Sequence, residues 1–232
     1  MKSLLILGAG GFGHMIQETA MLLGYEKVSF LDDAVKDPLV VGKCCDYRDF
    51  LDSYEAAVAA LGDNGMRLYW TEKLMEAGYQ VPALIHPSAV VSPSAVIGQG
   101  SFVLQRAVVN THTVVEHGVL INSGAVVDHD SYIASGAHIG LGSVVKSNCT
   151  IASKRKVEAG EVIFSTRRKI DGVSDRNLED AIYAFGFGPR CSYVKPFGAG
   201  HINETYAVYM PMADGEDELA YVLQRVNSNV FK

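Results

Sequence analysis

The chain has 232 residues and a formal net charge of −6 at pH 7, with 26 acidic and 20 basic side chains. This acidic balance argues against a nucleic-acid partner, because phosphate backbones are bound through clustered Lys and Arg side chains. No apolar run approaches the ~20 residues that a membrane span requires. The four cysteines have neither metal-ligand spacing nor the pattern of a disulfide framework. We therefore expect a cytoplasmic protein with no membrane span and no bound metal.

The N-terminal segment has the pattern of a βαβ unit. Ser3–Leu7 reads as a buried strand and is followed by the string Gly8-Ala9-Gly10-Gly11-Phe12-Gly13. A helical pattern then runs to about Leu23, and a second strand at Lys27–Leu31 ends in Asp32-Asp33. This order, strand, GxGxxG turn, helix, strand and acid, is typical of nucleotide-binding folds.

A glycine-rich turn at a helix N-terminus binds phosphate, because it allows close backbone approach and presents N–H donors. We therefore expect four glycines of the turn to contact a nucleotide-like substrate: Gly8, Gly10, Gly11 and Gly13. Asp32 or Asp33 would accept hydrogen bonds from a ribose or a base. The alternative is a turn that only packs the helix on the strand. A complete dinucleotide fold does not fit, because the α/β pattern ends by about Leu84.

The sequence patterns are weaker in the rest of the N-terminal part, residues 55–85. Glu55–Leu61 is a further candidate strand, and Met66–Ala77 has a helical pattern. Val81–Ile85 then leads into His86-Pro87-Ser88-Ala89. We place a boundary here, giving a Rossmann-like domain at residues 1–84 and a second domain at residues 85–168. The connection between them is short, so we expect a rigid arrangement.

A strict six-residue period begins at Ile85. Every sixth residue from Ile85 to Ile163 is Ile or Val, fourteen in all. Most hexads also carry a small residue four positions later, such as Ala89 or Ala95. This period is the signature of a hexapeptide β-helix, in which three hexads close one coil. Residues 18 apart would stack at about the 4.8 Å strand spacing. A Val-rich β-sandwich is the alternative, but sandwiches do not hold such a period.

One histidine of the β-helix has the surroundings of a base. Val127 is at an inward position, so His129 points outward, between Asp128 and Asp130. A carboxylate that accepts one ring N–H fixes the tautomer and stabilises the imidazolium. Eighteen residues on, the backbone N–H of Ser147 can face an oxyanion near His129.

Two other histidines of the β-helix lack these surroundings. His112 and His117 do not have an acid on both sides. We expect both to be solvated surface side chains.

These motifs form one ordered set that resembles a known family. It comprises the glycine turn, Phe30-Leu31-Asp32-Asp33, Gly62-Asp63-Asn64, His86-Pro87-Ser88-Ala89 and the hexads containing Val127-Asp128-His129-Asp130. Over residues 1 to about 165 the chain resembles bacterial sugar acyltransferases of the sialic acid O-acetyltransferase and UDP-4-amino-sugar N-acetyltransferase type. The resemblance implies a Rossmann-like domain for a sugar or nucleotide-sugar substrate, a left-handed parallel β-helix, a homotrimer and acetyl-CoA as donor.

The resemblance also implies roles for single residues. His129 falls on the family's general base, and Asp130 on the acid that orients it. His138 falls on a second histidine that helps to hold the thioester of acetyl-CoA. Ser147 falls on the backbone donor to the oxyanion.

The chain departs from the family pattern at two places. Family members commonly have a histidine inside the glycine turn, whereas this chain has Phe12 there and its nearest histidine is His14. The last hexads contain Ser153-Lys154-Arg155-Lys156 in place of small residues. This basic cluster could meet the phosphates of coenzyme A or form a solvated edge.

The six-residue period ends after Arg168. We predict a linker at residues 169–177, a short helix at Leu178–Phe185, and strands at Tyr193–Phe197, Thr205–Met210 and Leu219–Val226. This small α+β tail, residues 178–232, resembles the start of an N-acetylhexosamine kinase, with Gly198–His201 in a loop over ATP. No second lobe follows, and phosphoryl transfer needs one. We expect a fusion of two sugar-modifying enzymes, with the kinase-like part incomplete.

The function expected is transfer of an acetyl or related acyl group from acyl-CoA to an amine or hydroxyl of a sugar carried on a nucleotide. Two alternatives remain open at this point. One is an NAD(P)-dependent reductase that uses the glycine turn. The other is a non-catalytic scaffold that binds a sugar nucleotide and presents the tail to a partner.

Overall fold

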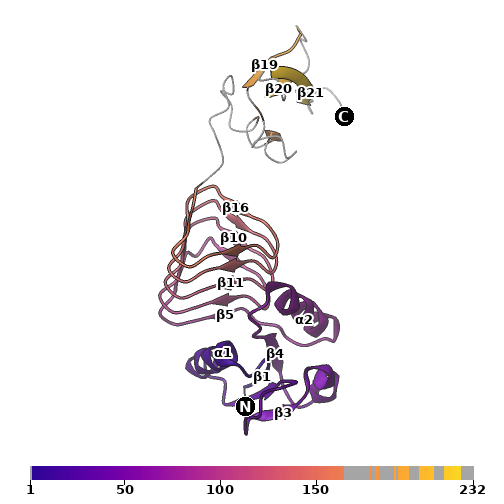
Figure 1. The fold of residues 1–232 in the computed structure, drawn as a ribbon, viewed down its shortest axis with the longest axis vertical. Coiled ribbons are helices and arrows are strands. Elements are labelled where there is room, and N and C mark those ends of the chain that lie inside the picture. Colours follow the sequence, from indigo (N-terminus) through magenta and orange to yellow (C-terminus); the bar gives the residue numbers. More distant parts are fainter. Residues whose placement is uncertain are drawn as a thin grey trace. The chain divides into compact units, whose positions relative to one another are not determined.

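The computed structural model describes residues 2–164, 178, 181–182, 191, 193–198, 204–211 and 217–225. The chain divides into two compact units, residues 1–165 and 166–232, which are described separately. In the first unit an α/β part is followed by a stack of parallel coils (Figure 1). The predicted linker at residues 169–177 lies outside the described residues.

The α/β part is built on a four-stranded parallel sheet of order β3-β2-β1-β4. Its central strand is fully buried, as expected where helices cover both faces of a parallel sheet. The sequence missed β3 and the 3₁₀-helix η1, because both are too short to show a period. The elements are β1 Ser3–Leu7, α1 Gly11–Leu22, β2 Lys27–Leu31, β3 Val40–Gly42, η1 Cys44–Phe50, β4 Ala56–Ala59 and α2 Asn64–Glu76.

The hexads form a left-handed parallel β-helix of fourteen two-residue strands, as predicted. Within each face, neighbouring strands are 18 residues apart in sequence and pair in parallel, for example Val127 with Val145. The first face consists of β5 Leu84–Ile85, β8 Phe102–Val103, β11 Leu120–Ile121, β14 His138–Ile139 and β17 Lys156–Val157. The second consists of β6 Val90–Val91, β9 Val108–Val109, β12 Val126–Val127, β15 Val144–Val145 and β18 Val162–Ile163. The third consists of β7 Val96–Ile97, β10 Val114–Val115, β13 Tyr132–Ile133 and β16 Thr150–Ile151.

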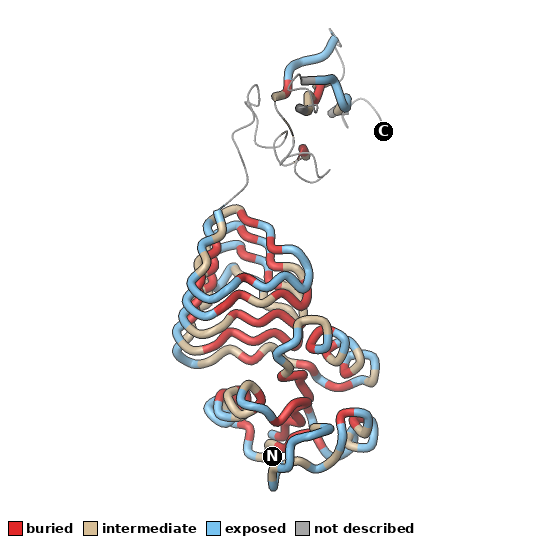
Figure 2. Tube along the Cα trace, in the orientation of Figure 1, coloured by how far each residue is buried: buried red, intermediate tan, exposed pale blue. Residues whose placement is uncertain are grey.

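The core of the β-helix is the column of branched residues that the six-residue period predicted. Buried and exposed residues alternate around each coil (Figure 2). The second residue of each strand is fully or almost fully buried from Val103 to Val157. Small residues such as Ala107 and Ala125 are buried beside them. Each such branched side chain contributes about 1.5–3 kcal/mol on burial, so the column supplies much of the stability of the β-helix.

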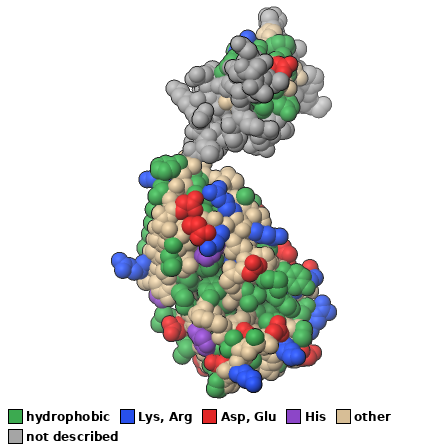
Figure 3. Space-filling model, in the orientation of Figure 1, with side chains coloured by type: hydrophobic (Ala, Val, Ile, Leu, Met, Phe, Trp, Pro, Cys, Tyr) green, Lys and Arg blue, Asp and Glu red, His purple; other side chains and the backbone are tan. Residues whose placement is uncertain are grey.

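The α/β part and the β-helix share a hydrophobic core. Leu84, Phe102 and Leu120 are outward residues of the first face, and they are buried with residues of β1 and α1. Phe12 meets Phe102 edge to face, with ring centroids 5.5 Å apart. The phenylalanine in the glycine turn therefore serves to pack α1 on the β-helix. On the surface, hydrophobic side chains gather over α2 (Figure 3), where Tyr69 is about half exposed.

The corners of the β-helix share one backbone conformation. Every sixth residue from Gly100 to Gly160 has a positive φ, between 55° and 71°. Glycine adopts this region without strain, whereas other residues do so at a cost. At the corner between the third and first faces the residues are Gly100, Gly118, Gly136 and Lys154, and α2 lies against this corner; we call it the covered corner. At the corner between the second and third faces they are His112, Asp130 and Asn148; we call it the open corner.

The second unit contains a three-stranded antiparallel sheet of order β19-β20-β21. The strands are β19 Tyr193–Pro196, β20 Glu204–Pro211 and β21 Asp217–Arg225, close to the three predicted. Val194 and Val208 are buried with Ile182, which is helical. The remaining residues of the predicted helix lie partly outside the described residues, as do residues 199–201 of the predicted ATP loop. The second unit therefore has the small α+β fold that the sequence predicted.

Candidate functional site

The site with the clearest chemistry lies at the open corner. β12 ends at Val127, which is fully buried, and the chain then turns through Asp128, His129 and Asp130. The Asp130 N–H donates to the Thr111 carbonyl one coil earlier, at 3.0 Å. The Asn148 N–H donates to the His129 carbonyl, also at 3.0 Å. Since the backbone is tied to both neighbouring coils, the position of the His129 imidazole is set by the β-helix.

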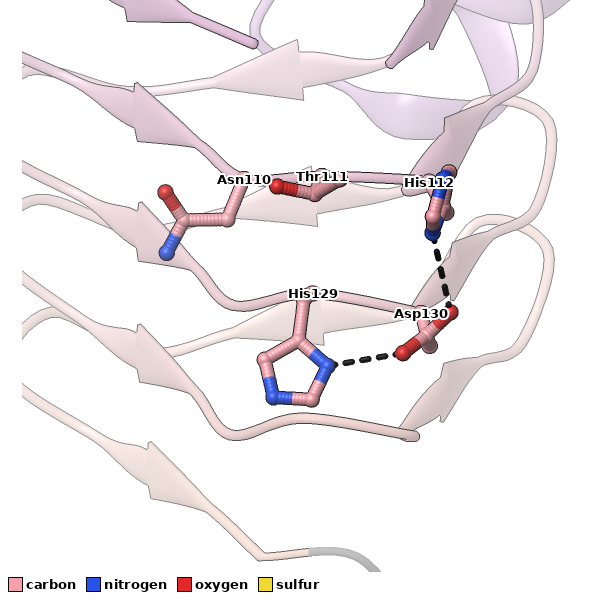
Figure 4. A pocket seen from close by; sticks show the side chains of 5 residues that line it. All are labelled: Asn110, Thr111, His112, His129 and Asp130. Carbon is pink, nitrogen blue, oxygen red and sulfur yellow. Dashed lines mark hydrogen bonds and ion pairs between the residues drawn. The ribbon is translucent and has the colours of Figure 1, made fainter. Parts of the chain in front are cut away.

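His129 is paired with Asp130, as the sequence suggested. Its Nδ1 lies 2.8 Å from Asp130 Oδ2 (Figure 4). Because a carboxylate only accepts, Nδ1 carries the hydrogen and Nε2 is the nitrogen that accepts a proton. The His129 side chain is 49% exposed, so a substrate can reach it. This is the arrangement that a general base requires.

Asp128 precedes His129 in the sequence, but its carboxylate bonds Asn110 and the backbone of the turn. Its Oδ1 accepts hydrogen bonds from Asn110 Nδ2 at 3.0 Å and from the His129 backbone N–H at 2.9 Å. The Asn110 bond, with that backbone N–H, lowers the pKa of the Asp128 carboxyl. Asp128 therefore fixes the backbone of the turn, while Asp130 binds the ring.

A pocket of about 490 Å³ opens beside this pair. Its lining comes from two consecutive coils at the same corner: Asn110, Thr111, His112, His129 and Asp130. His112 Nδ1 lies 3.5 Å from Asp130 Oδ1. His112 is 67% exposed, as predicted for a surface histidine, but it borders the site. The signal that could have found it is the spacing, since His112 stands 18 residues before Asp130.

The two residues predicted to contact the acyl donor lie in different places. Ser147 is at the open corner one coil after His129, because the β12–β15 register stacks residues 18 apart. His138 is on β14 in the first face, which lies opposite the open corner in a three-sided coil. A single chain therefore brings His129 and Ser147 together but not His129 and His138.

His138 is held neutral at physiological pH. Burial, together with the positive charges of Arg67 and Lys156, lowers the pKa of its imidazole to about 4. Asn122 Nδ2 lies 3.2 Å from His138 Nε2 and donates to it. The neutral ring then carries its hydrogen on Nδ1, which is available as a donor.

The glycine turn contains two kinds of glycine. A Cβ at Gly8 would lie 2.7 Å from the Ala60 carbonyl oxygen, and one at Gly13 would lie 2.0 Å from the Gly8 carbonyl oxygen. Packing alone requires glycine at these two positions. A Cβ at Gly10 or Gly11 would meet nothing within 4 Å. These two glycines have no packing role, and they stand at the start of α1, where N–H groups can receive an anion.

Asp32 and Asp33 both anchor backbone. Asp32 Oδ2 accepts from the Ala9 N–H in the glycine turn, and its Oδ1 accepts from the Ala34 and Val35 N–H groups, each at 2.8 Å. Burial acts to raise the pKa of the Asp32 carboxyl, but these three bonds outweigh it and the pKa is lowered. Asp33 Oδ1 accepts from the Cys44 N–H at 3.1 Å.

A second pocket, of about 430 Å³, follows this strand end. It is lined by Val35, Lys36, Asp37, Pro38 and Val40. His14 Nε2 lies 3.7 Å from Asp37 Oδ2 at its edge.

Two further properties concern only the described residues. In that part of the chain, no group of three or more His, Cys, Asp or Glu side chains is placed to hold a metal ion. No helix there has the length and apolar character needed to cross a bilayer.

Comparisons with known proteins agree with this fold. The PglD N-terminal domain family matches residues 3–74. The acetyltransferase domain of PglB from Neisseria gonorrhoeae FA1090, solved with acetyl coenzyme A, is 34% identical with a TM-score of 0.65, covering 71% of this chain and 91% of that one. PerB from Caulobacter crescentus, solved with CoA and GDP-perosamine, is 27% identical with a TM-score of 0.63, covering 71% of this chain and 90% of that one.

Proposed function

The chain belongs to the sugar acetyltransferases that join a Rossmann-like domain to a hexapeptide-repeat β-helix, and on that premise we propose that its acceptor is an amino sugar carried on a nucleotide. Acetyl-CoA is the donor. The observation that carries the chemistry is the bond between His129 Nδ1 and Asp130, which leaves Nε2 to accept a proton. A reductase and a non-catalytic scaffold find no support among relatives that are acetyltransferases.

The reaction follows from this arrangement. The acceptor nitrogen attacks the thioester carbonyl carbon while His129 Nε2 removes a proton from that nitrogen. Asp130 stabilises the imidazolium that forms. The backbone N–H of Ser147 donates to the oxyanion of the tetrahedral intermediate. When the intermediate collapses, the C–S bond breaks, and the coenzyme A sulfur leaves with the proton from His129.

An amine is favoured over a hydroxyl as the acceptor by the relatives. The PerB complexes contain GDP-perosamine, and one of them is named as a GDP-perosamine N-acetyl transferase that is 26% identical to this chain. A half-exposed histidine base also suits an amine, which is more nucleophilic than a hydroxyl.

We propose that residues 1–84 hold the nucleotide and residues 85–168 hold the acyl donor. The diphosphate would lie against the N-terminus of α1, next to Gly10 and Gly11, where no side chain is needed by packing. Asp32 supports this contact indirectly, by fixing the Ala9 N–H in the turn. The pocket at residues 35–40 is the adjoining place for the base.

We also propose a homotrimer with the site between subunits. Outward apolar side chains line the two faces that flank the open corner: Val90, Val108, Val126, Val144 and Val162 on the second face, and Val96, Val114 and Tyr132 on the third. Such stripes are covered in stable proteins, and a second copy offers matching ones. We assign His138 to the acyl donor of a site shared with a neighbouring subunit, because a single chain holds it away from His129. Light scattering that finds a monomer at micromolar concentration would refute this arrangement.

The dependence on acetyl-CoA and a nucleotide sugar supports a cytoplasmic location, which cell fractionation would test. We propose that residues 178–232 are a kinase-like segment, because their sequence resembles the start of an N-acetylhexosamine kinase.

The test of the function is a transfer assay on the full chain. Acetyl-CoA is incubated with UDP-, GDP- and CMP-linked amino and hydroxyl sugars, and released thiol and product mass are measured. We expect acetylation of at least one nucleotide-linked amino sugar and no change in NAD(P)H absorbance. His129→Ala should lower kcat by roughly 10²–10⁴, the contribution of a general base.

His117→Ala is the matched control. It occupies the same hexad position at the covered corner, where it contacts Ser135 and Glu72. Its loss removes structural contacts, so stability should fall slightly and kcat should stay within about twofold. If His129→Ala keeps full turnover, the base is another residue.

A further inference from the structure

The coil that precedes His129 at the open corner supports its turn residue by residue. Asn110, Thr111 and His112 stand 18 residues before Asp128, His129 and Asp130 respectively. Asn110 bonds the Asp128 carboxylate, and the Thr111 carbonyl accepts the Asp130 N–H. His112 directs its Nδ1 at Asp130 Oδ1 (Figure 4). Each of the three residues thus contacts the turn of the next coil.

Asp130 is therefore shared between two imidazoles. One carboxylate oxygen meets His129 Nδ1 at 2.8 Å, and the other lies 3.5 Å from His112 Nδ1. A carboxylate that rotates about its Cβ–Cγ bond would lose alignment with His129. A donor on the second oxygen opposes that rotation, because both oxygens are then held at once.

The backbone at His112 allows its side chain to be removed. His112 has φ 57°, a left-handed conformation that glycine adopts freely and that histidine enters more readily than most L-residues. Six of the eleven corner positions from Gly100 to Gly160 use glycine. Arg106 has almost the same φ, so what distinguishes His112 is the contact of its imidazole with Asp130.

We propose that His112 is a positioning residue for the acetyl transfer: its imidazole holds Asp130 in the orientation that keeps His129 Nε2 directed at the acceptor. This inference rests on the proposed function of His129. His112 acts through Asp130 and is not assigned contact with the reacting atoms. The charged groups that act on the neighbouring Asp128 carboxyl are His129 in the same turn and Lys146 one coil on.

The test uses two substitutions that the backbone tolerates. His112→Gly removes the imidazole and relieves the positive φ, so the variant should fold at least as stably as the parent chain. His112→Asn places an amide nitrogen where Nδ1 stood and also tolerates a positive φ. We expect kcat to fall roughly tenfold in His112→Gly, a fraction of what the base itself contributes, and to recover most of that loss in His112→Asn.

Arg106→Gly is the matched control. Arg106 has φ 58° at the corner between the first and second faces, and its N–H donates to Ser88 Oγ at 3.1 Å. The His112 N–H donates to Ser94 Oγ at 3.2 Å in the same way. The two positions thus differ chiefly in what the side chain contacts. Arg106→Gly should leave kcat and KM unchanged and, like His112→Gly, should not lower the melting temperature.

A second readout does not depend on transferase activity. In ¹⁵N-histidine NMR spectra of the full parent chain, the His129 ring should carry its hydrogen on Nδ1. In His112→Gly the same ring should exchange between its two tautomers. In the same variant the dependence of kcat/KM on pH should change shape, whereas loss of a purely structural contact would lower kcat/KM equally at every pH.

The outcomes separate the two proposals. If the parent chain transfers no acetyl group but the His129 tautomer shifts in His112→Gly, the proposed function fails and the positioning role stands. If His112→Gly keeps the parent kcat, pH profile and tautomer, the inference is wrong. It is also wrong if Arg106→Gly loses as much activity, or if light scattering shows that His112→Gly only disrupts the assembly.

Discussion

The covered corner and the open corner of the β-helix have the same backbone conformation, but three of the four positive-φ residues at the covered corner are glycine and none of the three at the open corner is. At the covered corner, a Cβ at Gly100 would lie 2.6 Å from Thr71 Cγ2, and one at Gly136 would lie 3.0 Å from Leu68 Cβ. At the open corner the corresponding residues are His112, Asp130 and Asn148, with φ between 55° and 57°. Glycine is present where α2 presses on the turn.

The difference shows how one repeat supports both packing and chemistry. Asp, Asn and His are the L-residues that enter the left-handed region most readily, so the open corner carries polar groups at modest cost. The covered corner is tied instead by Arg67, which donates to the Gly118 and Gly136 carbonyls at 2.9 Å. Substitutions at the covered corner should therefore change stability, and those at the open corner should change activity.

The largest effect is expected from Arg67→Met. Arg67 is fully buried, and its guanidinium also donates to the Leu61 carbonyl and to Asn64 Oδ1. Removing it leaves buried carbonyls without donors, so the free energy of unfolding should fall by about 3–5 kcal/mol. Urea denaturation measures this. Arg48→Met, at an exposed position, should change it by less than about 0.5 kcal/mol.

Gly136→Ala tests the contact between α2 and the covered corner by adding a single Cβ atom. The added Cβ is strained by φ 70° and meets Leu68 Cβ at 3.0 Å, so we expect a loss of about 2–3 kcal/mol. Gly142→Ala is the control, because its φ is 60° but nothing lies within 4 Å of the new Cβ. It should lose only about 1 kcal/mol. Equal losses would mean that α2 does not press on the covered corner.

Asp130→Asn tests the open corner. Asn tolerates the positive φ, so stability should be nearly unchanged. The imidazolium of His129 would lose its counter-charge, and kcat should fall roughly 10- to 100-fold, equivalent to about 1.4–2.8 kcal/mol. Steady-state kinetics and thermal melts on the same sample separate the two effects. A fall in the melting temperature that matches the loss of activity would contradict the assignment.

The pH dependence of stability reports on His138, which is buried beside Arg67. Burial beside Arg67 and Lys156 lowers the pKa of His138 to about 4, below that of an unfolded histidine near 6.5. Between these values the unfolded chain binds more protons, so stability should be full above pH 6.5 and decline toward pH 4. His138→Gln should flatten this slope. Melting temperatures across pH 4–8 measure this dependence of stability on pH.

The smallest effect is expected from removing the second unit. Both corners and the shared core lie within residues 1–165, and the second unit has its own core around Val194 and Val208. A chain ending at Asp171 should keep its oligomeric state, melting temperature and transfer rate. The full chain should not phosphorylate sugars with ATP. Aggregation of the shorter chain would show that the second unit supports the first.

The six-residue period by itself determined the β-helix, because only one inward side chain per hexad can fill so narrow a core. The register then followed from the sequence, since residues 18 apart stack in every coil. The same local logic gave β1, α1, β2 and the pairing of His129 with Asp130, which are neighbours in sequence. It would also have given the contact of His112 with Asp130, had the spacing been applied to that pair.

Only the tertiary structure decided what each glycine and acid does. Gly8 and Gly13 are required by packing and Gly10 and Gly11 are not, and this depends on what approaches the turn in space. The burial of Arg67 and the low pKa of His138 arise because α2, far away in sequence, lies against the covered corner. No period encodes that contact, since packing between elements depends on shape and distance that a single repeat does not carry.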